Sequence, residues 1–389
     1  MKALCWNGPG RVGVGTVPDP TVRNEQDIIV KVRQSATCGS DLPLVAGQIP
    51  LAHAGEIIGH EFVGEVVEVG PEVRRHRVGD RVVACPFVSC GRCWFCEHDL
   101  PACCDNGNSG ALAAEDTWGG AASGCLGFPE AMGGFAGSHA EYVRVPFADQ
   151  NAFGVPEGVS DDRALFAADA VSTGWMGAER SQVGAGDVVA VWGAGAVGLA
   201  AARAASLLGA ERVIVIDRYQ YRLDLATEWA GAETIDYHET DVHGELRERT
   251  GGRGPDVCIE AVGMQPHNSG PQLLYDRAKK QIRFSTERPS PVEQAVLACR
   301  KGGNVFVLGL FTRPVERFPL DAVMHKSLTV RSAQQHGQRY VPMLLERMAR
   351  DEIRAERLAT HRMPLEEAPK GYELFRDRAD QCVRAVFTP

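Results

Sequence analysis

The sequence has no hydrophobic run long enough to cross a membrane. Its longest uncharged apolar stretch, Val188 to Ala202, has 15 residues and includes three glycines, whereas a membrane-spanning helix needs ~20 apolar residues. After Lys2, glycine, proline and a charge interrupt the N-terminal segment at residues 7–11, so the apolar core of a signal peptide does not follow. We therefore expect a soluble, cytoplasmic protein with no membrane partner.

A surplus of basic residues is also missing. The 389 residues include 41 Lys and Arg against 50 Asp and Glu, a formal charge of −9. Nucleic-acid binders normally present a basic face, so no nucleic-acid partner is expected. Hydrophobic residues make up 44% and charged residues 23%, a mixture typical of globular proteins that excludes a disordered or fibrous chain. At ~150 residues per domain, the length indicates two or three domains.

The order of predicted elements changes near residue 170. Before it, apolar segments such as Ile28–Val32 and Phe62–Val69 are bounded by turn residues and indicate strands. Beyond it, short apolar runs alternate with helix-length segments, a pattern typical of βαβ units and a doubly wound parallel sheet. The six runs are Val188–Trp192, Val213–Asp217, Thr234–Asp236, Val257–Glu260, Asn304–Leu308 and Leu328–Val330. A polar insertion at 264–294 interrupts the alternation, and a helix over Val341–Asp351 and a strand over Val383–Phe387 are predicted near the C-terminus.

A glycine-rich motif follows the first of these runs. It lies between a predicted strand and a predicted helix, and the next strand ends at Asp217, 19 residues beyond Gly198. This context matches the dinucleotide-binding fingerprint, in which glycines permit a tight turn and close approach of the backbone to a pyrophosphate at the helix N-terminus. A glycine-rich turn that only packs is the alternative interpretation. The predicted phosphate-binding residues are Gly193, Gly195, Ala196, Val197 and Gly198.

The acidic residue that ends the second strand indicates which cofactor is bound. Asp217 is placed to accept hydrogen bonds from the ribose hydroxyls of the adenosine, and its charge would repel a 2′-phosphate. The neighbouring Arg218 could hold such a phosphate. With Asp217 present, the sequence favours NAD over NADP.

Four of the twelve cysteines lie in one short segment. Cys90, Cys93, Cys96 and Cys104 are separated by two, two and seven residues. In a reducing compartment thiols remain free, so such a cluster indicates metal ligation rather than disulfides. Four thiolates at ~2.3 Å close a tetrahedral shell, which predicts a structural zinc ion with no position left for substrate. Cys103 is an alternative fourth ligand on sequence grounds alone.

Two further segments carry residue types that bind metals. Cys38-Gly-Ser40-Asp41 and Gly59-His60-Glu61 each stand at the end of a predicted strand. With the cysteine loop, the glycine motif and Glu260-Ala-Val-Gly263, they make the whole chain resemble the zinc-dependent alcohol dehydrogenases of the medium-chain dehydrogenase/reductase family. Asp169 stands where many members carry a second catalytic cysteine. This Asp and the insertion resemble the branch that contains glutathione-independent formaldehyde dehydrogenase.

The resemblance implies a chain of two domains. A β-rich, GroES-like catalytic domain would comprise residues 1–170 and 336–389, with the structural zinc loop at 90–104. A Rossmann-type NAD-binding domain, built on the six-stranded parallel sheet, would comprise residues 171–335 and include the insertion. Members of the family commonly form dimers or tetramers, so a homodimer or homotetramer is expected.

The resemblance also implies an active site. Cys38, His60 and Asp169 would hold a catalytic zinc ion with one position free for substrate oxygen, which makes two zinc ions per chain. Ser40 stands where the family's hydroxyl relays the alcohol proton, and Glu61 resembles the acidic residue behind the zinc. The further cofactor contacts that the resemblance implies are Thr173, Arg222, Val262, Leu308, Gly309, Leu310 and Arg384.

The expected activity is transfer of hydride between an alcohol, or an aldehyde hydrate, and NAD. One feature departs from the family: its relay histidine would fall at Pro43, so the proton must leave through the cofactor ribose, water or another residue. Two alternatives remain. One is a zinc and NAD enzyme that keeps its cofactor and catalyses dismutation with no net redox change, and the other is a catalytically silent NAD-binding scaffold.

Overall fold

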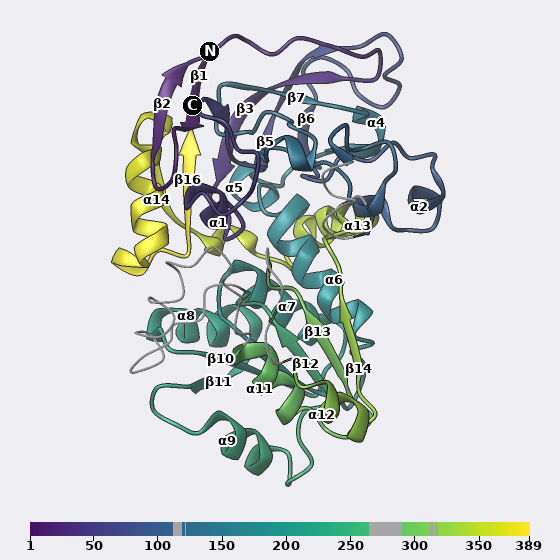
Figure 1. The fold of residues 1–389 in the computed structure, drawn as a ribbon, viewed down its shortest axis with the longest axis vertical. Coiled ribbons are helices and arrows are strands. Elements are labelled where there is room, and N and C mark those ends of the chain that lie inside the picture. The colour runs from purple at the N-terminus through teal and green to yellow at the C-terminus, as the bar shows by residue number, and fades with distance from the viewer. Residues whose placement is uncertain (112–118, 121, 264–289, 312–314, 316–317) are drawn as a thin grey trace. The chain divides into compact units, whose positions relative to one another are not determined.

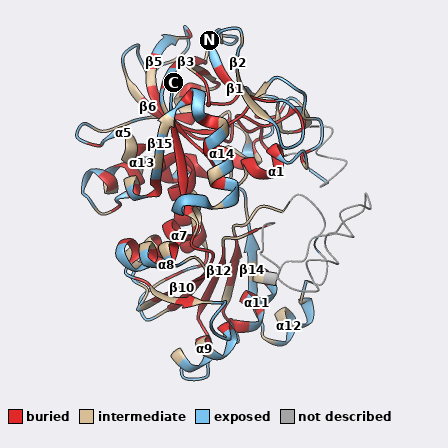
Figure 2. Cartoon of the chain, turned by 90° about the vertical axis from the view of Figure 1, so that its left-hand side faces the viewer, coloured by how far each residue is buried: buried red, intermediate tan, exposed pale blue. Residues whose placement is uncertain are grey.

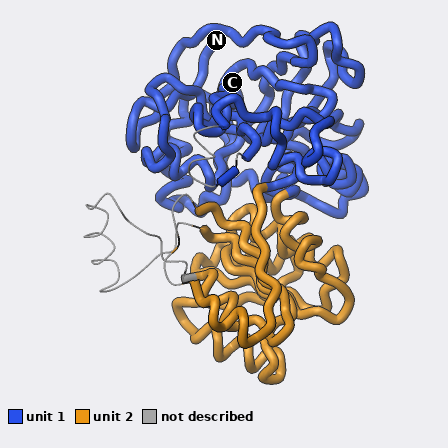
Figure 3. Tube along the Cα trace, turned by 45° about the vertical axis from the view of Figure 1, so that its right-hand side comes forward, with its two compact units in different colours: residues 1–172, 335–389 blue, residues 173–334 orange. Residues whose placement is uncertain are grey.

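The computed structural model describes residues 1–111, 119–120, 122–263, 290–311, 315 and 318–389. They form two compact units (Figure 3). Unit 1 comprises Met1–Ser172 and Gln335–Pro389, and unit 2 comprises Thr173–Gln334. Of the predicted insertion, residues 264–289 lie outside the described part of the chain.

Unit 1 is built on two β-sheets (Figure 1). Seven strands form the larger sheet in the order β15-β16-β3-β5-β6-β8, with β7 paired to β3, and the smaller sheet has the order β2-β1-β4. The strands are β1 (Lys2–Trp6), β2 (Val12–Thr16), β3 (Ile28–Ala36), β4 (Glu56–Ile57), β5 (Glu61–Val69), β6 (Arg81–Ala84), β7 (Tyr142–Val145), β8 (Ala152–Gly154), β15 (Ala359–Pro364) and β16 (Arg384–Thr388).

The helices of unit 1 are short except near the C-terminus. They are α1 (Asp41–Val45), α2 (Trp94–Glu97), η1 (Pro101–Cys103), η2 (Glu130–Met132), α4 (Ala148–Asn151), α5 (Asp161–Ala164), the π-helical turn η3 (Ala167–Val171), α13 (Gly337–Ala349), η5 (Ala355–Leu358), η6 (Leu365–Glu367), α14 (Ala368–Asp377) and η7 (Ala379–Gln381). Helix α13 begins at Gly337 rather than at the predicted Val341, because its first turn carries no aliphatic residue to signal a helix.

The register of the central strands positions two of the predicted metal ligands. Strands β3 and β5 are antiparallel and pair Ala36 with Glu61. Cys38 lies two residues beyond Ala36, and His60 directly precedes Glu61. Because antiparallel partners run in opposite directions, the end of β3 and the start of β5 meet at the same edge of the sheet. Residues separated in sequence are thereby brought to one place.

Unit 2 contains the predicted six-stranded parallel sheet, and the fold-class prediction is confirmed. Its order is β11-β10-β9-β12-β13-β14. The strands are β9 (Val188–Trp192), β10 (Arg212–Asp217), β11 (Glu233–Asp236), β12 (Val257–Glu260), β13 (Asn304–Val307) and β14 (Thr329–Ser332). The helices are α6 (Ser172–Arg180), α7 (Ala196–Leu207), α8 (Gln220–Leu225), the π-helical turn η4 (Ala226–Ala230), α9 (Val242–Arg249), α11 (Ser290–Ala298) and α12 (Leu320–His325).

Both faces of this sheet are covered by helices, as the near-continuous apolar strands require. Val188 and Ala190 pack in a core cluster with residues of α9 and α11. Val189 and Val191 alternate with them, so they face the other side of the sheet, and they are fully buried as well. Figure 2 shows β10 and β12 as largely buried and the edge strand β14 as largely exposed, with further exposed residues on the outer surfaces of the helices. Among the described residues, we find no helix that is long and apolar enough to span a membrane.

Candidate active site

Three side chains from unit 1 converge on one point. Cys38 follows β3, His60 precedes β5, and Asp169 lies in the π-helical turn η3, a distortion that often occurs at functional sites. Oδ2 of Asp169 lies 3.3 Å from Sγ of Cys38 and 3.5 Å from Nε2 of His60, and all three donor atoms lie within 4.8 Å of one another. Donors bound to one tetrahedral zinc ion are roughly 3.3–3.6 Å apart, so the geometry fits a single ion.

The hydroxyl of Ser40 lies beside two of these donors. Its Oγ is 3.2 Å from Sγ of Cys38 and 3.3 Å from Nε2 of His60. The hydroxyl is therefore close to any oxygen that completes the metal shell. Pro43 lies one turn further along, within α1, and its ring nitrogen has no proton to donate.

A buried carboxylate holds two of the three ligands from behind. Oδ2 of Asp41 accepts a hydrogen bond of 2.8 Å from the backbone N–H of Cys38, and Oδ1 lies 3.1 Å from Nδ1 of His60. Burial by itself would raise the pKa of Asp41, but the facing His60 lowers it to about 2. The ionised carboxylate fixes Nδ1 of His60 as the protonated nitrogen, which leaves the Nε2 lone pair for a metal.

Glu61 and Arg384 form a second buried layer. Oε1 of Glu61 accepts the N–H of Ala170, the residue after Asp169, at 3.0 Å. Burial raises the pKa of Glu61 to about 8, despite the opposing charge of Arg384. The family resemblance implies that Arg384 contacts the cofactor. Its guanidinium is 3% exposed, donates to the carbonyl of Thr37 and lies 3.6 Å from Sγ of Cys38. The guanidinium therefore places a positive charge beside the sulfur of Cys38.

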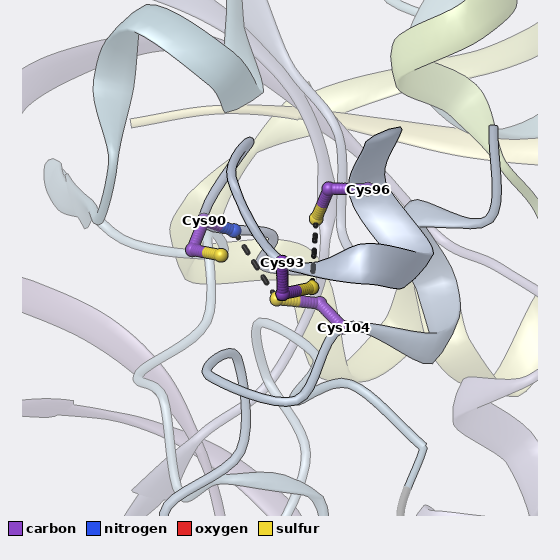
Figure 4. Close-up of side chains that lie close together, drawn as sticks. All are labelled: Cys90, Cys93, Cys96 and Cys104. Atoms are coloured by element: carbon purple, nitrogen blue, oxygen red, sulfur yellow. Dashed lines mark hydrogen bonds between the residues drawn. The ribbon is translucent and has the colours of Figure 1, made fainter. Parts of the chain in front are cut away.

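The four-cysteine loop also gathers its donors (Figure 4). Sγ of Cys93 lies 3.5 Å from Sγ of Cys96 and 3.8 Å from Sγ of Cys104. Four sulfurs at ~2.3 Å from a tetrahedral zinc ion lie roughly 3.8 Å apart, so these distances fit. The cluster contains Cys90 and Cys104 but not the alternative Cys103.

Two N–H donors stabilise the negative charge of these four sulfurs. The N–H of Cys90 donates to Sγ of Cys104 at 3.2 Å, and Nδ2 of Asn106 donates to Sγ of Cys90 at 3.3 Å. A hydrogen bond to the charged form of a group favours that form. No sequence pattern predicts a role for Asn106, because only the folded loop brings its amide to Cys90.

In unit 2, the fold itself requires glycine at two of the three glycine positions of the nucleotide motif. Gly193 has a φ of +95°, which a residue with a side chain rarely adopts. A Cβ on Gly198 would lie 1.8 Å from the carbonyl oxygen of Gly193, so only glycine fits. A Cβ on Gly195 would meet nothing within 4 Å. Gly195 precedes Ala196 and Val197, the first residues of α7, whose N–H groups are free for an anion.

Asp217 ends β10 beside this turn. Its Oδ2 accepts the N–H of Ala194 at 2.7 Å, and its Oδ1 accepts the N–H of Arg218 at 2.7 Å. Oδ1 also accepts the N–H of Tyr219 at 3.2 Å. The carboxylate thus anchors the glycine-rich turn, and its Oδ2 retains a lone pair for a ribose hydroxyl. The guanidinium of Arg218 lies 4.8 Å, and that of Arg222 5.3 Å, from the centre of the Tyr219 ring.

The ends of β12 and β13 are joined through Glu260. Its Oε1 accepts the N–H groups of Val262 and Gly263, both at 2.7 Å, and its carbonyl accepts the N–H groups of Leu308 and Gly309 at 2.8 and 3.2 Å. Val262, Leu308 and Gly309 therefore form one rigid edge of unit 2. Leu310 continues this segment, whereas Thr173 lies in α6.

Comparison with known proteins assigns the family. Residues 24–157 match the family model described as alcohol dehydrogenase GroES-like domain, and residues 196–279 match zinc-binding dehydrogenase. A zinc-type alcohol dehydrogenase-like protein of Bacillus subtilis is 36% identical over 394 residues, covering all of both chains. The chain belongs to the zinc-dependent alcohol dehydrogenase family. Its members are oxidoreductases, and the predicted membership is confirmed.

Further full-length relatives of this zinc-dependent dehydrogenase support the same family assignment. A glutathione-independent formaldehyde dehydrogenase of Pseudomonas aeruginosa is 32% identical over 402 residues, covering 96% of this chain and 94% of its own. The structure of an alcohol dehydrogenase from Thermus sp. ATN1 has a TM-score of 0.83 and 33% identity, covering 100% and 99% of the two chains.

Solved relatives of the dehydrogenase contain nicotinamide cofactors. An alcohol dehydrogenase from Escherichia coli is complexed with NADH (26% identity, TM-score 0.78, covering 100% of this chain and 99% of its own). A zinc-binding dehydrogenase from Sinorhizobium meliloti is bound to NADP (27% identity, TM-score 0.77, with the same coverage). The family thus includes folds that hold either cofactor.

Proposed function

We propose that this dehydrogenase transfers hydride between a small alcohol, or an aldehyde hydrate, and NAD, with Cys38, His60 and Asp169 as ligands of a catalytic zinc ion. The convergence of these three donors carries the proposal, because three ligands and one free position are the arrangement of a catalytic zinc site. When bound, zinc would supply Lewis-acid stabilisation of the negative charge that develops on the substrate oxygen.

The protein's own groups then have separate tasks. Oγ of Ser40, beside two of the donors, is the first acceptor for the alcohol proton. Asp41 keeps Nε2 of His60 directed at the metal, and the guanidinium of Arg384 places a positive charge beside Sγ of Cys38. Because Pro43 cannot continue the proton path, the cofactor ribose or water is the next carrier.

A reaction with no net redox change is the second candidate, and Pro43 favours it. Dismutation with a retained cofactor releases no net proton from the NAD cycle, so the relay histidine is dispensable. Tightly bound NAD that survives dialysis of the purified protein would support this candidate. Stoichiometric NADH formation from an added alcohol would support the dehydrogenase instead.

We further propose NAD as the preferred cofactor. The support is the position of Asp217 at the end of β10, next to the glycine-rich turn that it anchors. The assay is a comparison of the dissociation constants for NAD and NADP. Equal affinities would contradict the assignment of Asp217 to the ribose.

The test of the metal assignment compares alanine substitutions at two buried cysteines, Cys38 and Cys5. We expect ~2 zinc ions per wild-type chain from the ligand count. Cys38→Ala should retain one zinc ion and NAD binding but lose hydride transfer. Cys5→Ala, which removes a buried thiol from β1, should retain both ions and activity. Full activity in Cys38→Ala would refute the proposal.

We also propose a homo-oligomer in a reducing compartment, as in the cytoplasm. Two lines of support are the exposed apolar side chains of Leu320 and Met324 on α12, 66% and 68% exposed, and twelve cysteines that are all free thiols. Light scattering on the purified protein measures the number of subunits. A monomer at micromolar concentration would contradict the oligomer.

A further inference from the structure

A chain of buried polar groups extends away from the metal ligands into unit 1. Tyr372 of α14 donates its hydroxyl to Oδ2 of Asp41 at 2.8 Å. Nε2 of His139 lies 3.0 Å from the same hydroxyl oxygen, and Nδ1 of His139 lies 2.8 Å from Oγ of Ser35 in β3. The four side chains are 0 to 3% exposed, so they have no access to solvent for alternative partners.

The chemistry of these groups fixes the direction of each hydrogen bond. An ionised carboxylate only accepts, so the Tyr372 hydroxyl donates to Asp41 and its oxygen must accept from Nε2–H of His139. Burial lowers the pKa of His139 to about 4, so its ring is neutral and carries one proton. Nδ1 is then an acceptor for the hydroxyl of Ser35. The three hydrogen bonds donated by Ser35, His139 and Tyr372 all run in the same direction, toward Asp41. Hydrogen bonds aligned in this way polarise one another.

Packing holds the same groups rigid. The His139 ring meets the ring of Tyr372 at 71° and that of Phe387 at 84°, with centroids 5.8 and 5.1 Å apart. Gly59, the residue before His60, packs directly on the His139 ring: a Cβ on Gly59 would lie 2.5 Å from that ring. His139 therefore contacts the metal site by two routes, through Tyr372 and through Gly59.

Both routes end on ligands of the proposed metal ion. Oδ2 of Asp41 accepts from Tyr372 and from the backbone of Cys38, while Oδ1 faces His60. If the Tyr372 hydroxyl is removed, the carboxylate loses one of the three polar contacts that fix its rotation. The rotation of Asp41 is then less restricted, and so is that of the His60 imidazole.

We propose that Tyr372 and His139 are positioning residues, which lock Asp41 and thereby pre-orient Cys38 and His60 for the catalytic zinc ion. This inference rests on the proposed function, since it requires a metal at those ligands. It assigns a role to α14 and to the segment before β7, which are distant from Cys38 in sequence and contribute no ligand.

The test is the rate at which the holoenzyme loses zinc to an excess of chelator, followed with a zinc-sensitive dye. Loss of an outer hydrogen-bond partner typically costs about 10-fold or more in metal affinity. Tyr372→Phe should therefore release the zinc of the three-donor site ~10-fold faster, and leave the four-cysteine site unchanged. Leu365→Ala is the matched control, since Leu365 lies in the same core cluster as Tyr372 without a part in the polar chain.

A second measurement keeps the inference falsifiable if these variants are unstable. With Co²⁺ in the three-donor site, Tyr372→Phe and His139→Leu should shift the visible absorption bands, which report ligand geometry. His139→Gln retains an N–H donor and should restore the wild-type spectrum. Identical spectra and release rates in all variants, or equal changes in Leu365→Ala, would overturn the positioning role.

The outcomes also separate the two proposals. If wild-type protein binds zinc only at the four cysteines, the proposed function fails. If it binds both ions and Tyr372→Phe releases them at the wild-type rates, the proposed function stands and only the positioning role is wrong.

Discussion

Acidification is expected to destabilise unit 1 through one buried histidine. The pKa of His139 is lowered from its ordinary 6.5 to about 4. Burial is the main cause; the negative charge of Asp41 opposes this lowering, and the positive charge of His60 adds to it. Between these two pH values the unfolded chain binds a proton at this position and the folded chain does not. Stability therefore falls as the pH drops from 6.5 toward 4, and above 6.5 the residue has no effect.

The magnitude follows from the shift. A difference of 2.5 pKa units corresponds to ~3.4 kcal/mol at full development, at ~1.36 kcal/mol per unit. At pH 5 the folded ring is still mostly neutral and the unfolded one mostly charged, so the loss relative to pH 7.5 is about 2 kcal/mol. That is a substantial fraction of the ~5–15 kcal/mol that stabilises a typical domain.

The assay compares wild type with His139→Gln by urea denaturation at pH 7.5, 6 and 5. Other carboxylates titrate equally in both proteins, so the difference between the two curves isolates His139. We expect the stability of wild type relative to the variant to decrease by about 2 kcal/mol between pH 7.5 and 5. His243→Gln, which removes an exposed histidine of unit 2, should follow wild type. Parallel pH dependence of wild type and His139→Gln would refute the reasoning.

Three further predictions concern the metal loop and the nucleotide motif. Cys104→Ser should lose the structural zinc ion and Cys103→Ser should keep it, as zinc analysis of the purified variants would show; zinc loss in Cys103→Ser would contradict the cluster. Gly195→Ala should melt at the wild-type temperature, because its Cβ meets nothing within 4 Å. It should bind NAD at least ~10-fold more weakly, because the second glycine of the motif allows the backbone to approach the pyrophosphate. Gly198→Ala should also melt earlier, because its Cβ would lie 1.8 Å from the carbonyl oxygen of Gly193; wild-type NAD affinity in Gly195→Ala would contradict the assignment. Asp217→Gly should lower the affinity for NAD relative to NADP in a binding titration, and an unaltered ratio would exclude a ribose contact.

Local patterns in the sequence are sufficient for those features that depend on neighbours along the chain. The six-stranded parallel sheet follows from apolar runs between helical segments, and the glycine motif from its place between a strand and a helix. The cysteine loop is similar, because its four donors lie within fifteen residues. The choice between Cys103 and Cys104 still required the structure. The two residues are adjacent in sequence, and only the folded loop shows which of the two sulfurs lies beside the other three.

The groups around the proposed catalytic metal depend on contacts between distant segments. Tyr372 meets Asp41 across 331 positions and Arg384 meets Cys38 across 346, so neither contact leaves a periodicity or a motif. Burial likewise appears only after folding, and it determines which carboxylate is ionised and which imidazole is neutral. The sequence by itself therefore determined the sheet, the glycine turn and the residue types of the metal sites. Tertiary structure decided which side chains orient those ligands, because long-range packing and desolvation exist only in the folded chain.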